Sequence, residues 1–205
     1  MINNLELIAP LMPTAPLMFC HLQIVCRQKD HKEKVKEGPL RTYFIKNEEH
    51  LRRVMPEVIM LCEHYGARAY INVGQKSIQK LQKLILAKIA MLEFNGNTQS
   101  PDKLISSAAG KLTAKEAIWV IDIDDVSMQE DVLEWLDKYF FLSKDLPFGD
   151  TRENTYLKGI IPTVHGCHLL TKSFNLKEFQ FEFMHKIDVH KNSMGTLLYY
   201  PSIEK

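Results

Sequence analysis

The sequence predicts an α+β fold for this chain of 205 residues, and three observations support that class. Some segments repeat apolar residues at helical spacing, whereas others form short β-branched runs bounded by turn residues. The second half of the chain has the order β-α-β-β-α-β, which is the ferredoxin-like pattern. An apolar fraction of 45% at this length permits a hydrophobic core without disulfide bonds.

Composition says more about the compartment in which the protein resides than about its function. The net charge of +1 means that any nucleic-acid surface must be a local patch. None of the four cysteines forms a CxxC pair, so we expect free thiols in a reducing compartment. The apolar N-terminal stretch contains Pro10, Pro13 and Pro16 and lacks a basic segment, which argues against a signal peptide. No run approaches about 18 apolar residues, so we expect a cytoplasmic protein without a membrane span.

Residues 1–110 are predicted to form a small N-terminal αβ module, with a polar link at 98–116 marking its end. Its strands are expected at 17–28, 41–46 and 67–73, and its helices at 47–64 and 75–94. The first helix repeats Leu51, Met55 and further apolar residues, and Gly66 ends it. The second helix carries Lys76, Lys80 and Lys83 on one face. We interpret this lysine stripe as a solvated helix face, and a track for a template backbone is the alternative.

Residues 111–205 are predicted to form the ferredoxin-like module. Its expected elements are a strand at 117–124, a helix at 127–141, strands at 158–163 and 167–172, a short helix at 175–183, and strands at 186–190 and 196–201. Ser127 and Glu130 suggest a capping box for the first helix, and residues 142–157 a long polar loop. In this order the first strand lies between the third and the fourth, so three strands should lie side by side.

Polar side chains recur on these three strands. Strand residues two apart share a face, so Asp122 and Asp124 point one way while the intervening isoleucines point to the helices. The neighbouring strands bring His168 on one side and Asp188 with His190 on the other. Three carboxylates and a histidine are therefore expected on one open sheet face.

Clustered carboxylates suggest a divalent metal site. Like charges at close range raise the cost of ionising each group, and a cation removes the conflict. Mg²⁺ or Mn²⁺ prefers carboxylate oxygens and keeps positions open for phosphate, so the chemistry indicated is phosphoryl or nucleotidyl transfer. Taken singly, each motif has a structural explanation, since an Asp-x-Asp at a strand end is commonly a turn or cap feature.

The motif order resembles the archaeo-eukaryotic primase superfamily, which includes primase–polymerases. The matching segments are VIDID at 120–124, GCH at 166–168 and KID at 186–188, and the tail LLYYPSIEK at 197–205 is also similar. The resemblance implies a catalytic core in which a small αβ module packs on an RNA-recognition-like module, as in a small phage-type member. It extends in outline over residues 66–201.

The resemblance also implies site residues and partners. The metal ligands and catalytic residues would be Asp122, Asp124 and Asp188, with Mg²⁺ or Mn²⁺. The nucleotide-binding residues would be His168, Arg68, Lys172, Lys191, Thr163, His165 and His190. The expected partners are an NTP or dNTP, a single-stranded DNA template and replication proteins, in the cytoplasm of a bacterial host.

Two departures keep other functions open. Gly166 stands where the family often has serine, and the chain lacks the cysteine spacing of the family's zinc module. One alternative is a module of the same fold that binds nucleic acid or a nucleotide without turnover. Another is a metal-dependent nicking endonuclease that would use His165 and His168 with Tyr199 or Tyr200 as nucleophile, although histidines three apart on a strand point to opposite faces.

Overall fold

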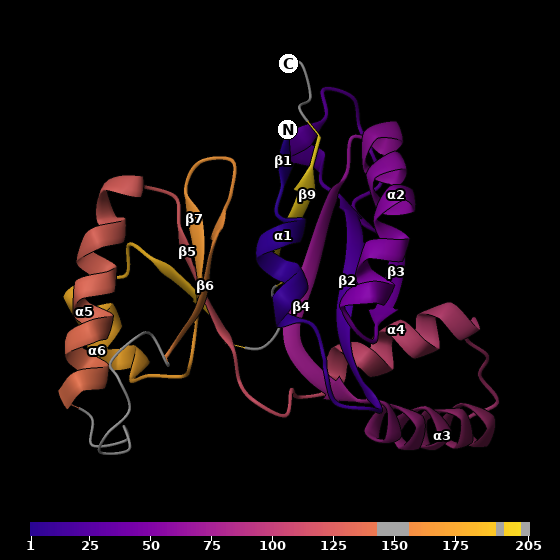
Figure 1. The fold of residues 1–205 in the computed structure, drawn as a ribbon. Helices are drawn as coiled ribbons and strands as arrows, with labels where there is room; N and C mark the ends of the chain where they lie inside the picture. Colours follow the sequence, from indigo (N-terminus) through magenta and orange to yellow (C-terminus); the bar gives the residue numbers. More distant parts are fainter. Residues whose placement is uncertain (143–155, 192–194, 202–205) are drawn as a thin grey trace. The chain divides into compact units, whose positions relative to one another are not determined.

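The computed structural model describes residues 1–142, 156–191 and 195–201 of the chain. Over these residues the fold is α+β, with two antiparallel sheets and six α-helices (Figure 1). The fold class predicted from the sequence is confirmed at this level. No helix in the described part of the chain is both long and apolar enough to cross a membrane.

The chain divides into two compact units that are not consecutive in sequence. One unit contains residues 1–117 together with 192–205, and the other contains residues 118–191. The structure therefore differs from the predicted division into 1–110 and 111–205. The reason is that strand β9 (Thr196–Tyr200), which follows the second unit in the chain, pairs with β1 (Ile2–Asn3) and β4 (Arg68–Ser77) of the first unit.

The first unit is built on a sheet of order β1-β9-β4-β2-β3. Its strands are β1 (Ile2–Asn3), β2 (Met18–Cys26), β3 (Gly38–Ile45), β4 (Arg68–Ser77) and β9 (Thr196–Tyr200). Helix α2 (Glu48–Tyr65) lies along one face (Figure 1) and contacts β2, β3, β4 and β9. The Asn47 side chain accepts a hydrogen bond from the His50 N–H at its start, and Gly66 ends it with a left-handed φ of 56°.

Shorter helices complete the first unit. They are α1 (Leu5–Ile8), α3 (Ile78–Phe94), α4 (Pro101–Lys111) and the 3₁₀ turns η1 (Ala9–Leu11) and η2 (Gln28–Asp30). Helices α3 and α4 pack together through Leu81, Ala108 and Ala109, and Phe19 of β2 joins this cluster. Helix α4 lies within the segment that the sequence predicts to be a polar, partly helical link.

The predicted lysine stripe is only partly observed. The strand β4 continues to Ser77, so α3 begins at Ile78 rather than near residue 75. Lys76 therefore belongs to the strand, where it is 3% exposed and donates a hydrogen bond of 3.0 Å to the Ala109 carbonyl. Lys80 and Lys83 are exposed on the helix, as expected. Helical spacing alone does not reveal this difference. Where a strand runs directly into a helix, no turn residue marks the position at which the apolar repeat changes from about two to about 3.6 residues.

His21, on β2, is a buried titratable group in the first unit. Its side chain is 8% exposed and stacks on Phe44, with ring centroids 5.6 Å apart. Its Nε2 atom has no hydrogen-bond partner among the described residues. Burial, followed by the nearby charge of Lys76, lowers the pKa of His21 from 6.5 to about 4.

We expect the free energy of unfolding to decrease as the pH falls from 6.5 towards 4, because the unfolded chain then binds a proton that the folded chain excludes. The full loss attributable to His21 is about 3 kcal/mol, and it is complete only below the folded pKa. Urea denaturation of the wild type and of His21→Leu across this range measures it. The variant should lose stability less steeply, and identical pH profiles would contradict the prediction.

The second unit contains a four-stranded sheet of order β6-β7-β5-β8 with antiparallel neighbours. Its elements are β5 (Trp119–Ile123), η3 (Val126–Met128), α5 (Gln129–Leu142), β6 (Leu157–Pro162), β7 (Cys167–Thr171), α6 (Leu176–Glu182) and β8 (Asp188–His190). Strand β5 lies between β7 and β8, as the sequence predicts. The predicted loop at 142–157 falls almost entirely outside the described residues.

Helices α5 and α6 cover one face of this sheet (Figure 1). Alternate strand residues, including Ile121, Ile123 and Leu169, pack against aromatic side chains of the helices. The start of the helical segment differs from the predicted capping box. The carboxylate of Asp125 accepts a hydrogen bond of 3.0 Å from the Ser127 N–H, and α5 begins only after the turn η3. An Asx turn at Asp125 therefore takes the role that we assigned to Ser127.

Candidate functional site

The strand register places three of the predicted site residues in one row across the second sheet. Asp122 of β5 lies directly opposite His168 of β7 on one side and opposite Asp188 of β8 on the other. Ile161 of β6 pairs with His168 and extends the row to the edge of the sheet. Directly opposed residues on antiparallel strands have Cα atoms about 5 Å apart, so their side chains are neighbours.

The row lies on the face opposite α5 and α6. Ile121 and Ile123 belong to the core under the helices, and so do Cys167 and Leu169. Asp122 and His168 alternate with these residues and therefore point the other way. For Asp122 the predicted separation of acidic and apolar residues onto the two faces of the strand is thus confirmed, and it explains how a buried strand carries a carboxylate.

Burial decreases along the row from His168 to Asp188. His168 is 3% exposed, Asp122 is partly buried and Asp188 is exposed. The Nε2 atom of His168 lies 3.3 Å from the Oδ1 atom of Asp122. Burial raises the pKa of the adjacent Cys167 thiol, and the negative charge of Asp122 raises it further, so this thiol stays protonated. The Cys167 thiol also donates a hydrogen bond of 3.3 Å to the Gln129 side chain.

Asp124 follows the last residue of β5 and is exposed. It is two residues beyond Asp122, but no strand partner is assigned to it. Within the described ranges, no three side chains of the types His, Cys, Asp and Glu lie close enough together to hold a metal ion. The structure therefore aligns Asp122 with Asp188 across two strands, but it does not gather the three predicted carboxylates into one ligand group.

Three further predicted residues lie close to the row along the chain. His190 pairs with Val120, two positions along β8 from Asp188, and is partly buried. Thr163 and His165 belong to the turn that joins β6 to β7. In this turn the Thr163 N–H donates to the Gly166 carbonyl at 2.9 Å, and the Gly166 N–H donates to the Thr163 hydroxyl at 3.2 Å. His165 is exposed at its tip.

The predicted basic residues do not join the row. Lys172 follows β7 at the end remote from Gly166, and its N–H donates to the Tyr156 carbonyl at 2.9 Å. The Lys191 ammonium lies 5.1 Å from the centroid of the Trp119 ring, where it makes a cation–π contact. Trp119 belongs to the core under the helices, so Lys191 lies at the start of β5 rather than beside its aspartates.

Arg68 lies on β4 of the first unit, where it has structural partners. Its Nε donates to the Asp30 carboxylate at 2.7 Å, and a second contact to the same carboxylate makes the pair bidentate. Its guanidinium also lies 4.3 Å from the centroid of the Tyr200 ring. Arg68 is thus held by Asp30 and Tyr200 within its own unit.

The tyrosines proposed for a nicking endonuclease lie on β9 of the first unit. Tyr199 is 1% exposed, and its hydroxyl donates to Glu63 at 2.9 Å. Burial raises the pKa of Tyr199 to about 12, and the hydrogen bond and charge of Glu63 add to the effect. A buried phenol that resists ionisation is a poor nucleophile, so this residue does not support the endonuclease.

Gly166 has a structural role at the site that motif spacing did not indicate. A Cβ atom placed on it would lie 1.8 Å from the Ile123 carbonyl oxygen and 3.2 Å from the Asp124 carbonyl carbon. The backbone of the turn before β7 therefore touches the end of β5. The close approach explains why position 166 is glycine. The only hint in the sequence was that glycine stands at position 166, where the sequence pattern would have allowed serine.

Comparison of the chain with models of protein families, with curated proteins and with solved structures finds no match. The assignment of a function therefore depends on the residues of the row and on their surroundings.

Proposed function

We propose that the second unit is the catalytic module of a primase–polymerase-like nucleotidyltransferase, in which divalent metal is held by Asp122, Asp124 and Asp188. The observation that carries the proposal is the row formed by Asp122, His168 and Asp188 on the helix-free face of the sheet. Each of the three resembling motifs contributes one residue to this row. The order of elements predicts that the three strands are adjacent, but it did not require their registers to coincide.

The topology of the second unit supports a ferredoxin-like, RNA-recognition-like assignment. Its elements follow the order β-α-β-β-α-β, and β5 occupies a central position between β7 and β8. A split βαβ fold has this order of elements, and its two helices share one face of the sheet and leave the other for ligands. RNA-recognition modules place aromatic residues on that face, whereas this chain offers Asp122, His168 and Asp188 there.

The donor set suits a hard divalent cation. Asp122 and Asp188 are carboxylates at directly opposed positions on neighbouring strands. Asp124 is exposed just after the end of β5, two residues beyond Asp122, and would have to approach them to complete the ligand set. Carboxylates that close repel one another when ionised, and this repulsion favours uptake of a cation. Bound Mg²⁺ or Mn²⁺ would supply Lewis-acid activation of a hydroxyl and stabilisation of a leaving pyrophosphate. The aspartates would fix the position of this chemistry on the sheet.

His168 has the contact of a positioning residue, and in this proposal it also meets the incoming nucleotide. Its Nε2 atom faces Asp122 at 3.3 Å, which restrains the orientation of that carboxylate. We assign the triphosphate of an incoming NTP or dNTP to the His168 end of the row, next to the turn that carries Thr163 and His165. His190 lies on β8, on the other side of β5, and would face the bound nucleotide from there. A single-stranded template, replication proteins and a cytoplasmic location complete the proposal. Arg68, Lys172 and Lys191 belong to it less directly, because their observed partners are structural.

A binding module without turnover is the second candidate. The contact between Asp122 and the buried His168 favours it, since such a pair also serves a purely structural purpose. The aspartates oppose it, because an anionic surface repels phosphate unless a cation is bound. The two candidates differ in whether metal binding and nucleotide incorporation occur at all.

The test is nucleotide incorporation on single-stranded DNA by the full chain, with and without a primer, in Mg²⁺ and in Mn²⁺. Calorimetric titration with Mn²⁺ alone would accompany it. We expect extension that requires metal and that a chelator abolishes. Binding of DNA or nucleotide with neither metal uptake nor extension would overturn the proposal in favour of the binding module.

A further inference from the structure

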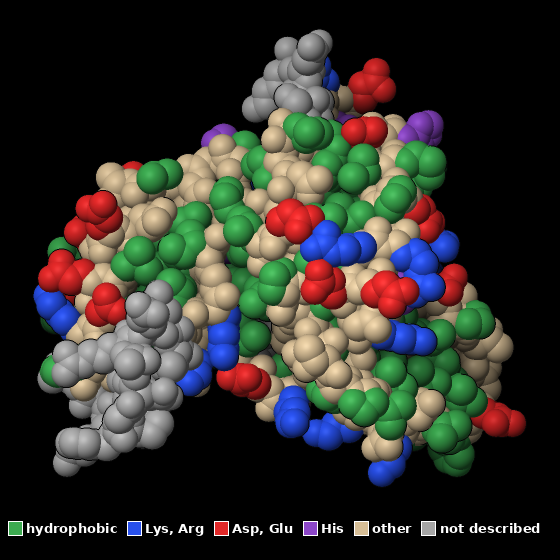
Figure 2. Space-filling model, in the orientation of Figure 1, with side chains coloured by type: hydrophobic (Ala, Val, Ile, Leu, Met, Phe, Trp, Pro, Cys, Tyr) green, Lys and Arg blue, Asp and Glu red, His purple; other side chains and the backbone are tan. Residues whose placement is uncertain are grey.

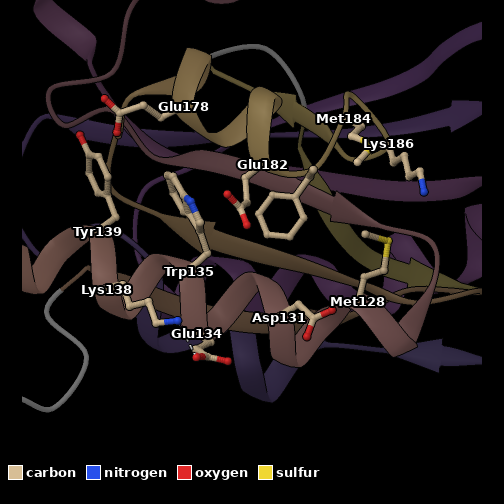
Figure 3. A pocket seen from close by; sticks show the side chains of 11 residues that line it. Met128, Asp131, Glu134, Trp135, Lys138, Tyr139, Glu178, Glu182, Met184 and Lys186 are labelled. Atoms are coloured by element: carbon tan, nitrogen blue, oxygen red, sulfur yellow. Dashed lines mark ion pairs between the residues drawn. The ribbon is translucent and has the colours of Figure 1, made fainter.

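A groove with a volume of about 850 Å³ lies between α5 and α6, in the helical layer of the second unit (Figure 3). Aromatic rings form its walls. Trp135 stacks on Tyr139 with centroids 5.2 Å apart and meets Phe183 edge-on at 6.4 Å. Figure 3 shows the Glu182 carboxylate beside the ring of Trp135, and Phe183 also lines the groove. The groove thus presents apolar surface and negative charge together.

The charge of the groove is negative, in contrast to the near-neutral chain. Its lining contains four carboxylates and two lysines, namely Asp131, Glu134, Glu178, Glu182, Lys138 and Lys186. The Lys138 ammonium lies 2.7 Å from Glu134. Its pKa is raised, mainly by Glu134 and to a smaller extent by Glu182, so the local field favours cations. Figure 2 shows acidic side chains gathered along α5 on the face drawn.

Methionines form the end of the groove near the turn after α6. Met128 and Met184 both line it (Figure 3), and Met184 is 75% exposed. Phe181 on α6 is 87% exposed. Methionine adapts its shape to a partner surface, and exposed apolar side chains rimmed by charge are typical of docking sites. An apolar surface beside carboxylates matches a partner that has apolar and cationic side chains.

We propose that this groove binds a basic amphipathic helix of a partner protein. Its apolar side chains would contact Trp135, Phe183 and the methionines, and its lysines or arginines would face the carboxylates and the aromatic rings. Nucleic acid is disfavoured as an occupant, because the carboxylates repel phosphates. The groove and the row of Asp122 lie on opposite sides of the sheet, so the docking site is independent of the proposed catalysis.

The test uses a synthetic leucine–lysine helical peptide as the probe, with a length of 14 residues to match α5. A second peptide replaces every lysine with glutamate. Binding of each dye-labelled peptide to the full chain is measured by fluorescence anisotropy at low and high salt. The double variant Glu178→Lys/Glu182→Lys reverses two exposed charges on α6. As a control, Glu93→Lys reverses one exposed charge on α3, outside the groove. Asp122→Asn tests whether the peptide binds the row of aspartates instead.

We expect the basic peptide to bind and the acidic peptide not to bind. The double reversal should weaken binding at least about tenfold, because like charges then face each other across the interface. Glu93→Lys and Asp122→Asn should leave binding unchanged, and Met184→Ser should weaken it at high salt, where the apolar part dominates. Failure of the basic peptide to bind, or equal affinity for the wild type and the double reversal, would overturn the proposal. Metal uptake by the double reversal variant should match that of the wild type.

Discussion

Replacement of Asp122 by Asn should reduce metal-dependent nucleotide incorporation by a factor on the order of a thousand, since a metal-held charge contributes several kcal/mol to such a transition state. Asn has nearly the same size and can still contact His168, so the folded state should persist. Asp122 is partly buried and carries no core packing, because its strand neighbours Ile121 and Ile123 form the core. Incorporation rates and thermal melting of the same preparations measure the two effects.

Asp125 provides the matched control for this substitution. It is an exposed carboxylate three residues further on, and its hydrogen bonds to Ser127 serve the turn η3 rather than the row. Asn also forms such turns, so Asp125→Asn should keep both activity and stability. If Asp122→Asn and the wild type incorporate nucleotide equally fast, the row of Asp122, His168 and Asp188 takes no part in the reaction. A large loss of stability in Asp122→Asn would show that the contact with His168 is structural.

Replacement of Gly166 by Ala should lower the free energy of unfolding by about 4 kcal/mol, because the methyl group meets backbone that cannot rotate away. The Cβ atom would lie 1.8 Å from the Ile123 carbonyl oxygen and 2.8 Å from its carbonyl carbon. Separation of β7 from the end of β5 relieves the clash, and it also shifts His168 away from Asp122. Chemical denaturation and hydrogen exchange of the β5 and β7 amides measure these two consequences.

Gly110 in α4 gives a control for the same chemical change. A Cβ atom at Gly110 has no neighbour within 4 Å, and alanine is the better helix former. Gly110→Ala should therefore keep or slightly raise the free energy of unfolding. If Gly166→Ala is as stable as the wild type, the turn at residues 163–166 can move away from the added methyl group without loss of stability. Serine at this position would then also be compatible with the fold.

The row was predictable from the sequence because three local rules combine in it. Alternation puts Asp122 on the face opposite Ile121, the order of elements makes three strands adjacent, and each motif places one polar residue in a short strand. The register that opposes Asp122 to both His168 and Asp188 did not follow from these rules. It depends on the lengths of the connections and on the close contact at Gly166.

Other features required tertiary information. The pattern of β9 identifies a strand, but it does not say which sheet the strand joins, and its pairing with β4 is a contact between distant parts of the chain. Lys76 was assigned to a helix because its spacing from Lys80 is helical, whereas the pairing of Lys76 with Phe19 extends β4 past it. The acidic groove was missed because Trp135, Phe183 and Glu182 converge only after the helices pack.

The pairing of β9 with β1 and β4 has a consequence for the order of folding during synthesis. The polypeptide leaves the first unit at residue 117 and returns to it at residue 192. Val120 and His190 are opposed on neighbouring strands, so the intervening unit closes on itself before the chain returns. The ribosome therefore releases a complete second unit while β4 still has an unpaired edge. A nascent chain stopped after residue 191 would therefore expose the edge of β4 to pairing with other strands.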